Sequence, residues 1–136
     1  MAESVKAHRR GVSIVELAIV TPLLLLLIFG VIEYAWLFLK ASGISNAARE
    51  GARYAATAGV TDLGQLTAWN SPLMRALDNA DIPLESATVT CATVTPGTGQ
   101  PVTVQVTVPY EAVRLIGLLP GPANLHATVT MLKEGV

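Results

Sequence analysis

Residues 17–32 read Leu-Ala-Ile-Val-Thr-Pro-Leu-Leu-Leu-Leu-Leu-Ile-Phe-Gly-Val-Ile, an apolar run without a charge. Extending the run back to Gly11 and on to Leu39 adds Glu16 and Glu33 as its only charged side chains. A helix that spans a bilayer needs about 20 mostly apolar residues, and a core helix of a small domain would not be apolar on every side. The stretch therefore predicts a transmembrane helix over residues 12–39.

The residues on either side of this helix predict its orientation. Lys6, Arg9 and Arg10 precede it, against one nearby acid, Glu3. Positive charge accumulates on the cytoplasmic side of a span. We therefore expect residues 1–11 to form a basic cytoplasmic leader of a protein that crosses the membrane once, with the rest of the chain outside the cytoplasm. Tyr34, Trp36 and Phe38 lie at the other end of the span, and aromatic rings favour the headgroup level. A cleaved secretory signal is the competing interpretation, but its apolar core would have about 7–15 residues.

The rest of the chain, residues 40–136, predicts one extracytoplasmic domain. Helical patterning continues over residues 40–58, and Gly59 is the expected C-cap of that helix. Apolar residues at helical spacing predict short helices within 62–80, where Trp69 reads as a core residue and Ser71 as an N-cap. Strands are expected at about 87–95, 102–108 and 125–132, of which the second alternates valine with polar residues; residues 96–101 form a turn. The predicted fold is α+β, with a long N-terminal helix packed against a small antiparallel sheet.

Small residues recur every four positions on the outer helix. They are Gly43, Ala47, Gly51 and Ala55, followed by Gly59. Such a groove lets another backbone approach closely. The occupant expected first is the sheet of the same chain, and the alternative is a neighbouring subunit. Within the span, Pro22 predicts a kink, and Thr21 beside it is a candidate to bond the carbonyl that the proline leaves free.

The two glutamates have different expected roles. Glu33 is 17 positions after Glu16, about 25 Å along a helix, so the two carboxylates fall near opposite faces of a hydrocarbon core about 30 Å thick. For Glu33 we expect a carboxylate extended to the membrane interface. Glu16 lies five positions after Gly11. If the chain were cut after Gly11, Val12 would carry a free amine that could pair with Glu16 of a neighbouring subunit, neutralising both charges and setting the register of packed helices.

A longer pattern carries a family resemblance. It comprises Gly11-x-Ser13-x-Val15-Glu16-x-Ala18-x-x-x-Pro22, a Leu-rich run, Phe29-Gly30-x-Ile32-Glu33, and Ala47-Ala48-Arg49-Glu50-Gly51-Ala52-Arg53-Tyr54-Ala55-Ala56. This pattern resembles the TadE-like family, the minor pilins or pseudopilins of the tight-adherence (Flp-type) pilus system. The basic residues, Gly11 and Glu16 look like a type IV prepilin signal, and a helix with a sheet packed on it resembles the type IV pilin plan. In one respect the sequence departs from the family, because Leu17 stands where Flp-type signals tend to have an aromatic residue.

The resemblance implies a bacterial cytoplasmic (inner) membrane protein that works by assembly, with the pilus itself as the alternative location. The implied partners are other pilin or pseudopilin subunits, the pilus assembly platform, membrane lipid, and prepilin peptidase if the chain is cut between Gly11 and Val12. The runner-up is a permanently anchored extracytoplasmic binding or scaffold domain, which would keep Met1. The mature N-terminus discriminates between them.

Composition argues against other classes. The net charge of −1, with scattered basic residues, predicts no nucleic-acid partner. His8 and His126 belong to separate parts of the chain, and no phosphate-binding glycine loop or Cys/His metal spacing occurs, so we expect no catalytic site, metal or cofactor. The single cysteine, Cys91, excludes an intrachain disulfide and reads as a strand residue, with an intermolecular bridge or lipid site as the alternative. A membrane-anchored enzyme would need a catalytic group that the sequence does not suggest.

Overall fold

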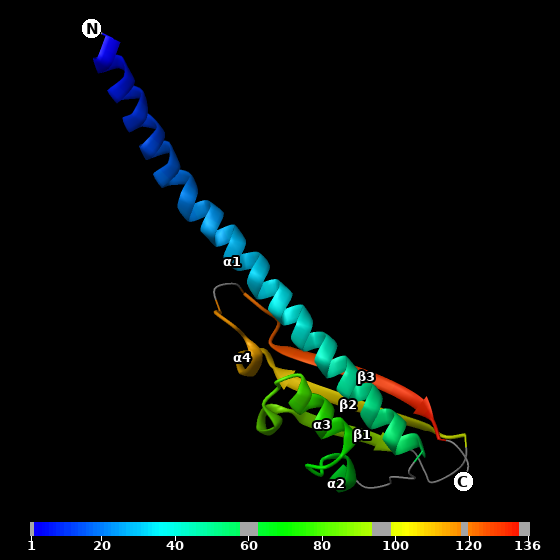
Figure 1. The fold of residues 1–136 in the computed structure, drawn as a ribbon. Coiled ribbons are helices and arrows are strands. Elements are labelled where there is room, and N and C mark those ends of the chain that lie inside the picture. Colours follow the sequence, from blue (N-terminus) through cyan, green and yellow to red (C-terminus); the bar gives the residue numbers. More distant parts are fainter. Residues whose placement is uncertain (1, 58–62, 94–98, 118–119, 134–136) are drawn as a thin grey trace.

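The structure, a computed structural model, describes residues 2–57, 63–93, 99–117 and 120–133, with the backbone alone for residues 2–12. Its main element is α1, a single helix of 56 residues over Ala2–Thr57. The N-terminal half of α1 projects from the molecule, and the C-terminal half runs along a three-stranded sheet (Figure 1). This arrangement confirms the predicted α+β fold, in which a long N-terminal helix packs against a small antiparallel sheet.

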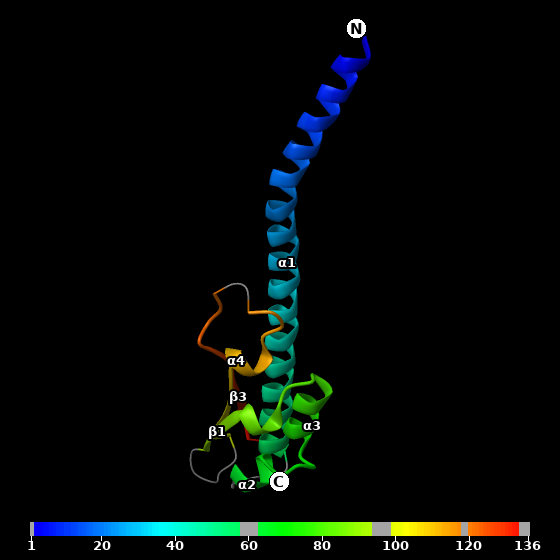
Figure 2. The same ribbon diagram turned by 90° about the vertical axis from the view of Figure 1, so that its left-hand side faces the viewer.

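The projecting part of α1 bends (Figure 2), and Pro22 lies in this part of the helix. A proline inside a helix lacks the N–H that would bond the carbonyl four residues before it, which here is Ala18, and its ring pushes that turn apart. Thr21 Oγ1 donates a hydrogen bond to the Leu17 carbonyl at 2.7 Å. The kink prediction is therefore consistent with the observed shape, but the Thr21 hydroxyl bonds a carbonyl next to the expected one.

The sheet has the order β1–β2–β3, with both pairs antiparallel, and consists of β1 (Thr88–Thr93), β2 (Pro101–Pro109) and β3 (Asn124–Leu132). In the register, Val104 of β2 lies opposite Cys91 of β1 and Val129 of β3. Alternate residues of a strand point to one face, and all four valines of β2 (Val102, Val104, Val106 and Val108) are fully buried. Cys91 is half-buried on the edge strand β1. The apolar face of β2 thus forms the centre of the core. The predicted turn at 96–101 falls partly, at residues 96–98, outside the described residues.

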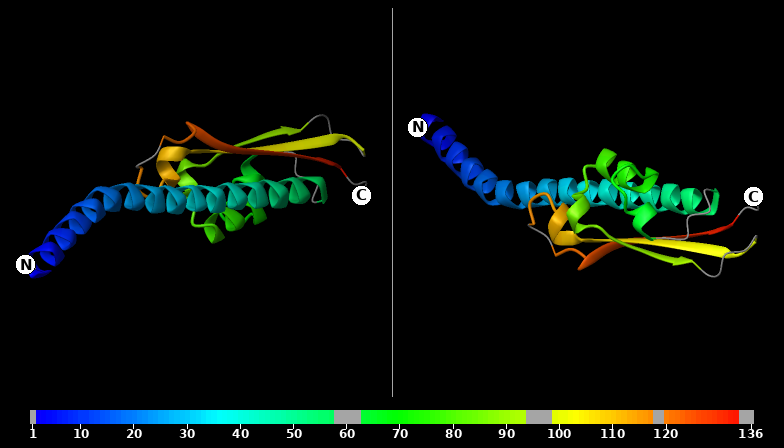
Figure 3. Two further views of the ribbon diagram at one scale, coloured as in Figure 1. Left: turned by 90° about the horizontal axis from the view of Figure 1, so that it is seen from above. Right: turned by 90° about the horizontal axis from the view of Figure 1, so that it is seen from below.

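The outer half of α1 lies between two layers (Figure 3). The sheet covers one side, and the short helix α3 (Pro72–Asn79) covers the other. The helix α2 (Leu63–Leu66) precedes α3 in the chain and contributes the buried Leu66 to the core. A 3₁₀ turn, η1 (Leu84–Ser86), leads into β1, and one further turn, α4 (Tyr110–Val113), follows β2. We call this part, from Glu33 of α1 onward, the globular domain. Its core joins the buried valines to Ile44, Leu66, Leu73 and Leu77.

The position of Trp69 contradicts the sequence prediction. Its side chain is 83% exposed rather than buried in the core, and Leu63 is also exposed. The cause is a turn that separates α2 from α3, closed by the hydrogen bond from Ser71 N–H to the Ala68 carbonyl at 2.8 Å. A continuous helix would have placed Trp69 beside Leu66 and Leu73, but the turn rotates it to solvent. Ser71 caps α3 as expected, because its hydroxyl accepts from the Met74 N–H.

The small residues of α1 pack within the chain, but their neighbour is mainly α3. A Cβ added to Gly43 would lie 2.6 Å from Ala80 Cβ, and one added to Gly51 would lie 3.2 Å from Leu73 Cβ. Ala47 and Ala55 are fully buried. The expectation that this groove faces the sheet is therefore wrong at both glycines, because α3 approaches α1 there. Gly59, the expected end of the helix, lies outside the described residues.

Candidate functional site: the projecting helix and its junction with the globular domain

The first part of the candidate site is the apolar surface of the projecting helix. All side chains of residues 13–32 are exposed except at Gly30. These 20 residues measure about 30 Å along a helix, the thickness of a bilayer's hydrocarbon core. By length and composition, α1 can therefore cross a membrane. So much exposed apolar surface requires lipid or other apolar helices around it.

The predicted processing and pairing residues all lie on this helix. The backbone is helical through Gly11 and Val12. Glu16 is exposed, four residues after Val12, which is about 6 Å along the axis. The small residues Gly43 and Gly51, by contrast, lie inside the globular domain against α3. The structure thus separates the predicted site residues into an exposed membrane-helix group and an internal packing group.

The second part of the site is the junction, which we define as Glu33, Trp36 and Lys40 of α1 with the groups that they bond. Glu33 is only 3% exposed. Its Oε1 accepts two hydrogen bonds, from the Tyr110 hydroxyl at 3.1 Å and from the Gly117 N–H at 2.7 Å. The expectation that Glu33 extends to the membrane interface is therefore wrong, because the globular domain supplies donors that replace water.

Tyr110 is suited to this donor role. Its burial, followed by the hydrogen bond and negative charge of Glu33, raises the pKa of Tyr110 above its ordinary value of 10.0. The phenol therefore remains protonated at neutral pH and can donate. Tyr110 follows Pro109, which ends β2 and is the N-cap of α4, so the end of the strand places the ring beside α1.

Lys40 and Trp36 fix α1 at two further points. Lys40 is 3% exposed, and its Nζ donates to the carbonyls of Ala80 at 2.9 Å and Asp81 at 2.6 Å. The same Nζ lies 3.2 Å from Asp81 Oδ2 and 4.6 Å from the centre of the Trp36 ring. Trp36 Nε1–H donates to the Val113 carbonyl at 2.9 Å. Trp36 therefore attaches α1 to the globular domain. Tyr34 and Phe38 are exposed, as expected for rings at a membrane interface.

The junction also limits the length of α1 that lipid can surround. Glu33, Trp36 and Lys40 recur at spacings of three and four, so they share one face of α1. This face is covered by the domain from Glu33 onward. The helix that is exposed on all sides therefore ends at Ile32, seven residues before the predicted end at Leu39.

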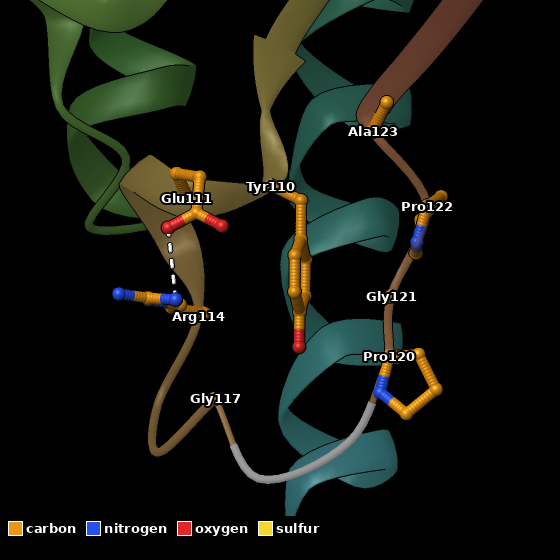
Figure 4. Close-up of a pocket in the computed structure, with 8 residues that line it drawn as sticks. All are labelled: Tyr110, Glu111, Arg114, Gly117, Pro120, Gly121, Pro122 and Ala123. Carbon is orange, nitrogen blue, oxygen red and sulfur yellow. Dashed lines mark ion pairs between the residues drawn. The ribbon is translucent and has the colours of Figure 1, made fainter.

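A shallow pocket of about 530 Å³ opens beside Tyr110 (Figure 4). It is lined by Tyr110, Glu111, Arg114, Gly117, Pro120, Gly121, Pro122 and Ala123. The Tyr110 ring lies between α4 and the segment that leads into β3, and a Cβ at Gly121 would come within 2.5 Å of the ring. The pocket's acid, Glu111, is paired with Arg114 at 2.9 Å. These contacts orient Tyr110 toward α1. Among the described residues, no group of three His, Cys, Asp or Glu side chains is arranged to hold a metal ion.

Comparison with known protein families identifies the N-terminal part of the chain. Residues 11–53 match the TadE-like protein family. The match confirms the predicted resemblance to this family over these residues. It covers about a third of the chain: the projecting helix, the junction residues of α1 and the small residues through Gly51. No curated protein and no solved structure matches the chain.

The sequence analysis missed the junction. The TadE-like segment contains Glu33, Trp36 and Lys40, but their partners Tyr110 and Gly117 are 77 and 84 positions away from Glu33. A local signal did exist. Glu33 and Lys40 are charged residues seven apart on one helix face, which is a costly arrangement unless something polar covers that face.

Glu33→Ala should destabilise the globular domain by about 2–4 kcal/mol, because the Tyr110 hydroxyl and the Gly117 N–H would lose a shared acceptor. Glu33→Gln should cost less, since its carbonyl can still accept both bonds. Urea unfolding of the full chain in detergent, followed by Trp36 fluorescence in a Trp69→Phe background, would measure the free energy of unfolding of each variant. Glu111→Ala is the control, because the exposed Glu111–Arg114 pair contributes about 1 kcal/mol or less. Equal stability of Glu33→Ala and Glu111→Ala would show that the junction has no such role.

Proposed function

We propose that this protein is a minor pilin or pseudopilin of a tight-adherence pilus that contributes to assembly by lateral packing of its N-terminal helix. The observation that carries the proposal is the continuous exposed apolar surface of residues 13–32 in a TadE-like segment. A domain of this kind does not need such a helix for its own core. Its use is to anchor the chain in a bacterial cytoplasmic membrane and to contact other apolar helices there.

The proposed topology follows from charge and length. The leader carries Lys6, Arg9 and Arg10, so it stays in the cytoplasm. The span begins near Ser13 and ends at Ile32, and the globular domain lies outside the cytoplasm. Membrane lipid, other pilin or pseudopilin subunits and the assembly platform are the proposed partners. The role is structural and requires no cofactor.

Glu16 is the proposed pairing residue. A carboxylate inside a bilayer is costly unless it finds a positive partner. Cleavage after Gly11 by prepilin peptidase would create an amine on Val12, about 6 Å from Glu16 along the axis. Pairing between Val12 of one subunit and Glu16 of the next would then require an axial offset of about one helical turn, which defines the stagger of the packed helices.

The second candidate function is a permanently anchored binding or scaffold domain, which Leu17 favours, since Flp-type signals tend to have an aromatic residue at this position. The two functions predict different N-termini. Intact-mass measurement of the chain from membranes that contain the pilus system should find a polypeptide that begins at Val12. A chain that keeps Met1 in the presence of active prepilin peptidase would favour the scaffold and contradict the pilin proposal.

A further inference from the structure

The segment that follows α4 has two apolar side chains that the fold leaves uncovered. Leu115 is 46% exposed and Ile116 is 51% exposed. They lie between Arg114 and Gly117, in the part of the domain that extends toward the projecting end of α1 (Figure 2). Neither residue belongs to the hydrophobic core, and neither lies in the TadE-like segment.

Two hydrogen bonds fix the position of this segment along the axis of α1. The Val113 carbonyl accepts from Trp36, and the Gly117 N–H donates to Glu33. Leu115 and Ile116 lie between these two attachment points. They are therefore held beside the turn of α1 that follows Ile32, where the helix exposed on all sides ends.

We propose that Leu115 and Ile116 insert into the membrane interface as a second anchor, which rests on the proposed membrane span of residues 13–32. The occupant of this apolar surface is the outer leaflet of the bilayer. The position of the pair just beyond the exposed helix supports this choice. Tyr34 and Phe38 support it as well, because they are exposed on the turns of α1 that follow Ile32. Arg114, which precedes the apolar pair, is half exposed but paired with Glu111 at 2.9 Å, so the anchor consists of the two apolar side chains.

A second anchor has a mechanical consequence. A domain held by one helix alone can rotate about that helix and tilt at the bend that contains Pro22. Two contacts with the bilayer restrict both movements. The domain would then present a constant side to neighbouring subunits, and the membrane itself would orient it before assembly.

Spin labels on the full chain test this proposal. In a Cys91→Ser background, Ile116→Cys, Leu132→Cys and Leu25→Cys would each carry one nitroxide, in anionic phospholipid vesicles at a low protein-to-lipid ratio. Oxygen concentrates in lipid and a nickel chelate stays in water. We expect the ratio of oxygen to chelate collision rates to be several-fold higher at residue 116 than at residue 132. Leu132 is the matched control, because it is exposed at the end of β3 away from the junction.

The label at residue 25 separates two failures. If residue 25 is in lipid while residue 116 meets the chelate as often as residue 132 does, the second anchor is wrong and the membrane span stands. If residue 25 also meets the chelate, the span itself is wrong, and the anchor fails with it. If neither reagent reaches residue 116, a protein surface covers it, and the bilayer is not its occupant.

Discussion

Glu16→Val should be retained in the membrane at least as well as the unsubstituted chain, yet be lost from pilus assembly. Removing an exposed carboxylate from the apolar helix lowers the cost of insertion, by up to about 3 kcal/mol for a central position and by less near the interface. The same change removes the group that we propose pairs with the Val12 amine of a neighbour. Quantifying the variant in membranes and in sheared filaments, together with the piliation of the cells, measures both effects.

Two control variants isolate the charge of Glu16. Leu17→Val changes the adjacent exposed side chain without altering charge and should assemble normally. Glu16→Asp keeps a carboxylate on a shorter side chain and should retain part of the assembly. The mass of membrane-bound Glu16→Val should show that cleavage after Gly11 is unaffected. Normal piliation with correctly processed Glu16→Val would refute the pairing model.

Gly51→Leu should destabilise the globular domain by about 3 kcal/mol or more. A Cβ at this position already overlaps Leu73 Cδ1 and comes within 3.2 Å of Leu73 Cβ and Cγ. A leucine would therefore push α3 away from α1 and open the core on that side. Urea unfolding of the full chain in detergent, followed by Trp36 fluorescence in a Trp69→Phe background, measures the loss.

A second substitution at the same contact tests the cause. Leu73→Ala alone should cost about 2–5 kcal/mol, because Leu73 is fully buried. In the Gly51→Leu background it should cost much less, since the removed side chain makes room for the new one. Asn46→Leu places the same side chain on an exposed position of α1 and should change stability little. Additive effects of Gly51→Leu and Leu73→Ala would contradict the packing account.

Glu16 and Gly51 differ in how much of their role could be predicted from the sequence alone. Glu16 and the apolar helix are local features: a charge in an uncharged run is conspicuous without any fold. The role of Gly51 was visible only in outline, as one of four small residues on a helix face. Its neighbour depends on where the chain returns after residue 57, and α3 rather than the sheet occupies that place.

The sequence by itself determined the helices and strands that a local pattern of residues predicts. An uninterrupted apolar run predicts a membrane helix, alternating valines predict β2, and Ser71 before Pro72 predicts the start of α3, because each depends on neighbours within a few residues. Only the tertiary structure decided that Glu33 is buried under Tyr110 and Gly117, that Lys40 bonds the end of α3, and that Trp69 is exposed. A buried charge and one that reaches water look alike in a helix pattern. The choice between them depends on whether a distant segment brings hydrogen-bonding partners to that face, and local periodicity carries no information about that contact.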